Sequence, residues 1–428
     1  MGGGVSHRGS HGTRYAGNRV TIPVAGSAAI ARRVAAAARW LAVAVGFAIP
    51  ISVAADGALV AAFALAWVTS GDYAGKWRAV RDNPAALAAV ALFALLAIGT
   101  LYGPAPTDLA LAQLGKYQDL LLVPMLVSVF TDLRFRRYAV RAFLAGMLVT
   151  LALSYLIGLK LFPEGVFRGT PADPTVFRLH VTQNFFMAYA AFALACLARS
   201  DSNQAQRGLL YAAAFLALFN VIFMVQGRTG YLVVAALLMF FLFERTGWKS
   251  IAIGAVALAL LTGGAFFGST SFRDAVNRGI TEFSQWQPER PADSSIGWRL
   301  EFYAQTLRMI QERPIAGVGT GGFPLAYGEQ VKGTGRVNPG HPHSEYLLMA
   351  AQLGVSGLAA FLALLVMHWT ASRRVSPPID RSLASGLVLA MALGCLFNTL
   401  LLDHSEGLFY CWLIGVLCAG VEPGPKAT

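Results

Sequence analysis

The sequence predicts an all-α polytopic membrane protein of about 12 transmembrane helices, with one large polar loop that contains an amphipathic helix. Composition is the first observation: 56% of the 428 residues are hydrophobic, 13% are charged, and the mean hydropathy is +0.56. A single soluble core of this length does not hide so much apolar surface. The second observation is that many stretches of about 18 or more residues lack charge, which is the length that crosses the hydrocarbon as a helix.

The expected spans follow one another along the chain, and the shortest of them could be tilted, partial or re-entrant. They cover residues 40–55, 58–70, 85–101, 117–130, 142–161, 180–197, 208–225, 230–243, 251–267, 343–369, 383–402 and 407–419. Nine spans therefore fall in segment 28–270 and three in segment 343–420. Residues 1–27 are rich in Gly, Ser, His and Arg without a hydrophobic period, which predicts a disordered basic cytoplasmic arm, and residues 421–428 form a short tail.

The distribution of Lys and Arg is the third observation, and it supports this count independently. With both termini in the cytoplasm, the inner loops collect most of the basic residues. The short outer loops keep only Lys116, Lys160, Arg168, Arg178 and Arg228. Adding or dropping one span would reverse every later loop, so the positive-inside rule favours twelve spans and puts loop 271–342 outside the cytoplasm.

The net charge of +12 has the same origin. It reflects this topogenic bias together with attraction to anionic inner-leaflet lipid, and we expect no nucleic-acid partner. The four cysteines fall inside expected spans, which predicts buried thiols rather than disulfides.

The large loop carries a helical pattern. Apolar residues recur at steps of four and three residues from Ile296 to Ile310, Ser294 is among the N-cap candidates, and Pro314 is expected to end the helix. Arg299 lies one residue off the apolar face. It is either a solvated arginine whose stem lies along apolar surface or a ligand contact.

A glycine cluster follows at residues 317–323. Glycines let the backbone approach a ligand closely, and successive N–H groups can bind an anion, which makes Gly319 and Gly321 candidates. A turn-rich connector is the alternative, because the Gly-Lys-Ser/Thr ending of a phosphate-binding loop is missing.

Arg228 sits between two glycines where two expected spans meet with almost no loop. An arginine there is costly unless it meets water, a carboxylate or an anionic ligand, and its planar fork suits phosphate oxygens. The alternative is a structural ion pair, with Asp403 or Glu406 as the partner.

His341 and His343 precede a helix that runs into the membrane. A neutral imidazole there could take a proton from a hydroxyl group or orient it, although a structural role is also open. Neither a metal-binding pattern nor a cofactor motif accompanies them, so we expect no metal and no cofactor.

Taken in order, these motifs resemble the bacterial O-antigen ligase and polymerase superfamily of membrane glycosyltransferases. They are QGRTGY at 226–231, SIGWR at 295–299, PIAGVGTGGF at 314–323, HPHSEYL at 341–347 and QLGVSG at 352–357. The resemblance covers about residues 208–402, and each motif is weak alone whereas the ordered set is specific. One departure is Ser344, where the family commonly has Asn.

The resemblance implies a glycosyltransferase of the bacterial inner membrane with a periplasmic active site. The outer segments carry no Asp-x-Asp metal motif, so we expect a metal-independent reaction, and direct attack at the anomeric carbon would invert its configuration. The donor would be O-antigen polysaccharide linked to undecaprenyl pyrophosphate, and the acceptor a sugar hydroxyl of lipid A–core. By motif, Arg228 and Arg299 would bind phosphate and His343 would deprotonate or position the acceptor. Further substrate contacts are expected from Arg178, His341, Lys332, Arg336, Gly319 and Gly321.

Three alternatives stay open. An O-antigen polymerase and a protein O-oligosaccharyltransferase would use the same lipid-linked donor, although one dominant loop and a short C-terminal tail favour the ligase. A lipid-linked sugar flippase would need charges deep in the spans, whereas the polar clusters here gather on one expected face.

Overall fold

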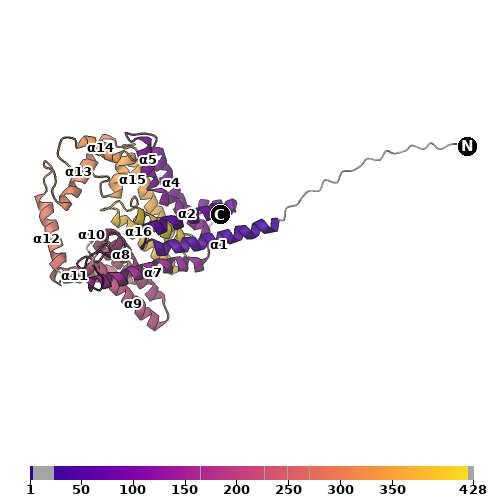
Figure 1. Ribbon diagram of the computed structural model, residues 1–428, viewed down its shortest axis with the longest axis horizontal. Coiled ribbons are helices and arrows are strands. Elements are labelled where there is room, and N and C mark those ends of the chain that lie inside the picture. The colour runs from indigo at the N-terminus through magenta and orange to yellow at the C-terminus, as the bar shows by residue number, and fades with distance from the viewer. Residues whose placement is uncertain (3–23, 164, 226, 248, 269, 423–428) are drawn as a thin grey trace.

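The protein is helical over the part that the computed structural model describes, which is residues 1–2, 24–163, 165–225, 227–247, 249–268 and 270–422 (Figure 1). Within these ranges no strand forms, and the isolated bridges are Thr170 with Asp173 and Val375 with Val421. The all-α prediction is confirmed. Most of the expected basic arm (residues 3–23) and the tail residues 423–428 lie outside the described residues.

The first half of the chain is built mainly of apolar helices. They are α1 (Val24–Ala48), α2 (Val53–Thr69), α3 (Tyr73–Arg81), α4 (Pro84–Gly99), α5 (Thr107–Gly115), the 3-10 helix η1 (Gln118–Leu121), α6 (Leu122–Val129), α7 (Leu133–Gly158), α8 (His180–Ser200), α9 (Gln204–Phe219), the π-helical turn η2 (Asn220–Met224) and α10 (Arg228–Thr246). The second half contains α11 (Lys249–Gly268), α12 (Thr270–Gln285), α13 (Ser295–Glu312), α14 (Phe323–Gln330), α15 (Glu345–Ser372), α16 (Pro378–Gly394) and α17 (His404–Cys418).

Five of the described helices are long and apolar enough to cross a membrane. These are residues Leu133–Gly158, His180–Ser200, Gln204–Met224, Thr229–Thr246 and Glu345–Ser372, and a sixth span is possible if α2 and α3, bent by 113°, count as one. Helix α4 and the stretch Gln118–Val129 are apolar but shorter. Several membrane-spanning helices are thus present, whereas the count of twelve stays a prediction.

The boundaries of the first expected span are wrong. The first was expected over residues 40–55, but α1 ends at Ala48 and the chain turns at Pro50. Proline lacks the N–H that a continuing helix needs, and the Ser52 side chain accepts a hydrogen bond from the Ala55 amide (3.3 Å) to cap α2. Helix α1 also begins at Val24, inside the segment assigned to the arm.

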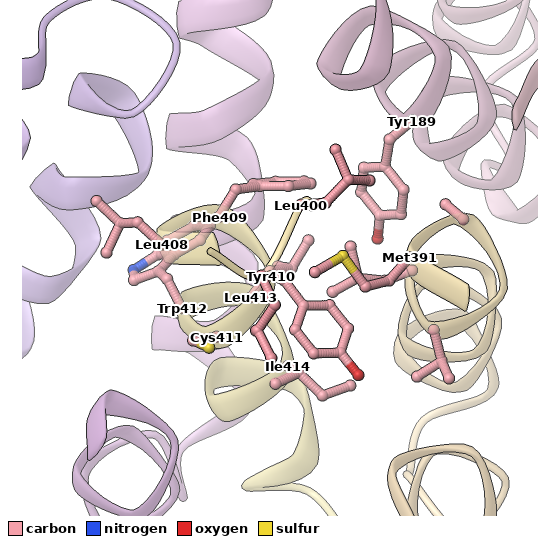
Figure 2. Packing of buried hydrophobic residues seen from close by; sticks show 14 of the residues in the cluster. Tyr189, Met391, Leu400, Leu408, Phe409, Tyr410, Cys411, Trp412, Leu413 and Ile414 are labelled. Atoms are coloured by element: carbon pink, nitrogen blue, oxygen red, sulfur yellow. The ribbon is translucent and has the colours of Figure 1, made fainter. Parts of the chain in front are cut away.

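The C-terminal helix α17 forms the centre of the core. Every residue from Glu406 to Cys418 is buried, as is typical of a helix that is apolar on all sides. Figure 2 shows Tyr189 of α8, Met391 of α16 and Leu400 around the α17 side chains Phe409 and Tyr410. This helix therefore fixes the relative positions of α8, α16 and the loop between α16 and α17.

The polar segment between α11 and α15 forms three helices along one edge of the molecule (Figure 1). Helix α13 confirms the expected amphipathic helix: Ser294 is its N-cap, accepting from the Gly297 amide (3.2 Å), and the helix ends at Glu312, before Pro314. The hydrophobic pattern of the loop did not predict α12 or α14. Helix α13 packs on α15, which brings the polar segment against the membrane helices.

Helix α15 is interrupted at Gly354, whose φ of +65° and ψ of −153° are not helical. The interruption frees backbone groups that an apolar environment does not tolerate unpaired. Residues of the glycine cluster pair with two of them: Val318 N donates to Ala351 O (2.9 Å) and Gly319 N donates to Gln352 O (2.7 Å). The motifs at residues 314–323 and 352–357, which are far apart in sequence, therefore contact each other.

The last large difference concerns residues 395–403, which we call the 395–403 loop. The sequence predicts one span over residues 383–402, but α16 ends at Gly394 and the chain folds back before α17. Hydropathy did not reveal this break, because Leu396, Phe397 and residues 400–402 are as apolar as a span. The loop lies at the end of the bundle where α8, α10, α15 and α17 begin, and we call this the loop end.

Candidate active site

The candidate base, His343, lies in a turn just before α15. Its φ of +55° is uncommon for a residue with a side chain, although histidine adopts this conformation more readily than most. The His343 amide donates to His341 Nδ1 (3.3 Å). The Tyr303 hydroxyl lies 3.3 Å from the carbonyl oxygen of His343 and 3.2 Å from that of Leu396. Contacts with α13 and the 395–403 loop therefore hold this conformation in place.

The imidazole of His343 packs between two rings. It stacks on Phe302 of α13 (centroids 5.9 Å, planes 22° apart) and meets His341 edge-on (4.5 Å, 69°). Within the described residues neither ring nitrogen has a hydrogen-bond partner. Burial, and then the charge of Arg299, lower the pKa of His343 below its ordinary value of 6.5. The ring is therefore neutral at pH 7 and has a free lone pair.

His341 has a different environment. Its Nδ1 accepts from the His343 amide and lies 3.1 Å from the Thr399 hydroxyl, which must then be the donor. These bonds assign the neutral tautomer with the proton on Nε2. Burial, then His343 and Lys116, lower its pKa to about 4. Because the protein uses its lone pair, His341 is suited to position the turn rather than to accept a proton from substrate.

Glu345 joins the start of α15 to the 395–403 loop. Its side chain is fully buried, and Oε2 accepts from the amides of Leu401 (3.1 Å) and Leu402 (3.2 Å). Its Oε1 accepts from the Tyr117 hydroxyl (2.9 Å), and its own amide donates to the carbonyl oxygen of Cys395 (3.0 Å). The sequence pattern assigned no role to Glu345, whereas in the structure its carboxylate holds the 395–403 loop against the start of α15.

The turn that carries Arg228 meets the same loop from the other side. Asn398 Nδ2 donates to the hydroxyl of Thr229 (2.7 Å), the residue after Arg228. The turn packs on Asn184 of α8: a Cβ at Gly227 would lie 2.3 Å from the side-chain nitrogen of Asn184, so a larger residue would displace that side chain from its bond to Val225 O (3.0 Å). The backbone of Arg228 begins α10, while its side chain lies outside the described part of the structure.

Arg299 and His343 lie close enough for the charge of Arg299 to act on the imidazole. Arg299, Phe302 and Tyr303 lie three and four residues apart on α13, so they share one face of that helix. Phe302 and Tyr303 contact His343, and the charge of Arg299 lowers the pKa of His343 after burial does. A positive charge therefore acts on a neutral imidazole at the loop end.

Lys116 is a candidate that sequence reasoning left among the outer-loop charges. It is exposed at the end of α5, and its charge acts on His341 and on Asp403, whose pKa burial raises to about 6. The available signal was a lysine in a short loop where the positive-inside rule disfavours one. Its distance of more than 200 residues from His341 in sequence concealed the proximity.

Arg178 has protein partners. It is buried, its guanidinium lies 2.6 Å from Asp56 Oδ2, and its Nε donates to the carbonyl oxygen of Ile49 (2.9 Å). His404 lies 3.0 Å from the other oxygen of Asp56. This network ties α2 to α8 and α17 at the loop end. Contact of Arg178 with substrate stays a prediction.

The remaining predicted contacts are dispersed. Arg336 Nε lies 3.5 Å from the buried Glu301 of α13, and the exposed Lys332 lies 3.4 Å from Glu329. The amide of Gly319 donates to α15, and that of Gly321 donates to Gln352 Oε1 (2.8 Å). Both amides are thus engaged within the protein. Substrate contacts by these four residues stay predictions, and the structure gives the glycines a packing role.

This arrangement is suited to a proton transfer next to an anion. His343 offers a neutral nitrogen, and Arg299 and Lys116 supply positive charge near it. Apolar helices begin at the same end, so a lipid-anchored molecule can present its head group there. Among the described residues, no group of three or more His, Cys, Asp or Glu side chains is placed to hold a metal ion.

Comparison with protein families identifies part of the chain. The family model described as O-Antigen ligase matches residues 212–362, which include α13, both histidines and the turn at Arg228. No curated protein matches the chain at a significant level. The matched stretch excludes Lys116, Arg178 and the 395–403 loop.

Proposed function

Because residues 212–362 match the family model described as O-Antigen ligase, we propose that this chain transfers O-antigen polysaccharide from undecaprenyl pyrophosphate to lipid A–core. The family consists of glycosyltransferase-like ligases and polymerases of the membrane. The observation that carries the proposal is the pairing of an unbonded, neutral His343 with Arg299 at the end of a membrane bundle.

The reaction needs a base and a stabilised leaving group. An acceptor hydroxyl oxygen forms a bond to the anomeric carbon of the donor while the bond from that carbon to the diphosphate oxygen breaks. The electron pair leaves with undecaprenyl pyrophosphate, and the hydroxyl proton passes to His343. Since one displacement attacks the face opposite the leaving group, the product has inverted configuration.

The leaving diphosphate gains negative charge as the bond breaks, and cations nearby lower that barrier. Arg299 and Lys116 lie near His343 and His341, respectively. Arg228 begins α10, and the next residue, Thr229, is hydrogen-bonded to the 395–403 loop. We assign binding of the diphosphate to Arg299, Lys116 and Arg228. His341 and Glu345 then act as positioning residues, because they hold the turn and the loop.

The orientation follows from charge. Basic residues such as Arg137, Arg199, Arg245 and Arg373 belong to the helix ends opposite the loop end. By the positive-inside rule that opposite end faces the cytoplasm, so we place the active site on the periplasmic side of the inner membrane.

The experiment is a transfer reaction with purified chain, undecaprenyl-pyrophosphate-linked polysaccharide and lipid A–core, without nucleotide. The proposal predicts a ladder on a lipopolysaccharide gel that requires lipid A–core and disappears with His343→Asn. Longer undecaprenyl-linked chains, formed when repeat units replace lipid A–core, would identify a polymerase instead.

A further inference from the structure

A half-open cavity lies at the end of the bundle opposite the candidate active site. It has a volume of about 570 Å³ and is bounded by α7, α8, α9 and α16. It opens where α7 and α9 begin and α8 ends. Helix α8 has 21 residues and begins at the loop end, so about 30 Å separate the two sites. The cavity is therefore distinct from the active site.

The walls of the cavity are aliphatic. Leu144, Leu194 and Leu383 are buried and form its floor, whereas Leu148 (40% exposed) and Leu209 (71% exposed) stand at its sides. Helix α9 projects from the body of the protein (Figure 1), and its packing is mainly against α8. The space between α7 and α9 is therefore apolar and open to the side, where the lipid would lie.

The mouth of the cavity is basic on one side. Arg137, Arg141, Ala145 and Leu148 follow at steps of four, four and three, so two arginines and two apolar residues share one face of α7. Asp380 lies in the wall, but Arg136 Nε is 3.2 Å from its Oδ2, so this carboxylate already has a counter-charge.

On its other side, the mouth of the cavity is lined by side chains that can form hydrogen bonds. The polar residues that line it come from the end of α8, the turn that follows and the start of α9: Ser200, Asp201, Ser202 and Gln206. Oδ1 of Asp201 accepts from the Asn203 amide (2.8 Å), which leaves its second oxygen able to accept another donor. Hydroxyl groups, which both donate and accept hydrogen bonds, match a rim that offers a carboxylate, two hydroxyls and an amide.

We propose that this cavity binds an anionic phospholipid with a hydroxylated head group, of the phosphatidylglycerol class. The phosphate pairs with Arg137 and Arg141, the head-group hydroxyls bond to Asp201 and the neighbouring polar side chains, and an acyl chain lies along Leu148 and Leu209. Basic pockets between membrane helices bind acidic head groups in this way. The inference does not depend on the proposed catalytic activity.

The test is native mass spectrometry of the full chain in detergent, titrated with phosphatidylglycerol and, separately, phosphatidylethanolamine. The double variant Arg137→Gln/Arg141→Gln removes the basic rim. The matched control is Arg134→Gln/Arg207→Gln, two exposed arginines at the same end that do not line the cavity. Ala145→Trp fills the apolar part while keeping both arginines.

Each arginine near a charged head group contributes roughly fivefold in affinity, so the double variant should bind phosphatidylglycerol about 25-fold more weakly. Ala145→Trp should also weaken binding, the control pair should not, and phosphatidylethanolamine should bind less than phosphatidylglycerol. Equal affinity for the two lipids overturns the proposal, as does equal loss in the control pair. Displacement of the lipid by millimolar inorganic phosphate would show a simple anion site and would also overturn it.

Discussion

The carboxylate of Glu345 should control whether the 395–403 loop stays closed. Three donors bond to it in a fully buried site: the amides of Leu401 and Leu402 and the Tyr117 hydroxyl. Leaving one buried donor unsatisfied costs about 1–3 kcal/mol, so Glu345→Ala should destabilise the closed loop by roughly 3–9 kcal/mol. Glu345→Gln retains an acceptor oxygen for the two amides and should cost far less.

The chain offers a built-in reporter for this change. Cys395 is buried at the start of the loop, and its carbonyl oxygen accepts from the Glu345 amide. Cys196 is also buried, near the far end of α8, and serves as the internal control. A maleimide labels each thiol only when its surroundings open, so site-resolved labelling under native conditions measures local opening.

In Glu345→Ala, Cys395 should label at least about 100-fold faster than in the unaltered chain, because ~3 kcal/mol is about two factors of ten. Cys196 should keep its rate, and Glu345→Gln should resemble the unaltered chain at both positions. Unchanged labelling of Cys395 in Glu345→Ala would refute the clamp. Equal acceleration at both cysteines would indicate global unfolding instead.

Three further predictions concern the chemistry. Arg299→Gln should lower kcat/KM for transfer by about 10²–10³-fold, because Arg299 acts on the base. Lys116→Gln should lower it by about tenfold, because Lys116 is exposed. Normal turnover by either variant would remove that residue from the site. The new glycosidic bond should have the opposite anomeric configuration to the donor by NMR, and retention would require two displacements. Chelation of divalent ions should leave the rate unchanged, and inhibition reversed by added Mg²⁺ would contradict the metal-free reaction.

Local patterns in the sequence predicted the parts of the fold that local interactions determine. The period from Ile296 to Ile310 with Ser294 and Pro314 predicted α13, because apolar spacing and end signals are contained in that helix itself. The pairing of Arg299 with His343 came from the motifs and not from any pattern that links the two.

The predictions that failed concern segments whose hydrogen-bond partners lie far away in sequence. Leu401 and Leu402 look like part of a span, yet their amides bond to Glu345, more than 50 residues earlier, so the helix does not need to continue. The amides of Gly319 and Gly321 looked free for an anion, yet both donate to Gln352 of α15: Gly319 to the carbonyl oxygen beside the interruption at Gly354, and Gly321 to the side-chain oxygen. No single-segment pattern contains either relationship.

The measurement closest to the central claim is the pH dependence of kcat/KM for transfer by the unaltered chain and by His343→Asn. Asparagine also tolerates the positive φ at this position, so the variant removes the base while the turn is kept. Burial and Arg299 lower the pKa of His343, so the neutral base persists below pH 6.5 and activity is lost only as pH falls through that lowered pKa.

We therefore expect a rate that is constant from neutral pH to below 6.5 and then falls tenfold per pH unit. In His343→Asn we expect a rate about 10²–10⁴-fold lower that lacks this acidic fall. An acidic fall centred at or above pH 6.5, or the same fall in His343→Asn, would contradict His343 as the base.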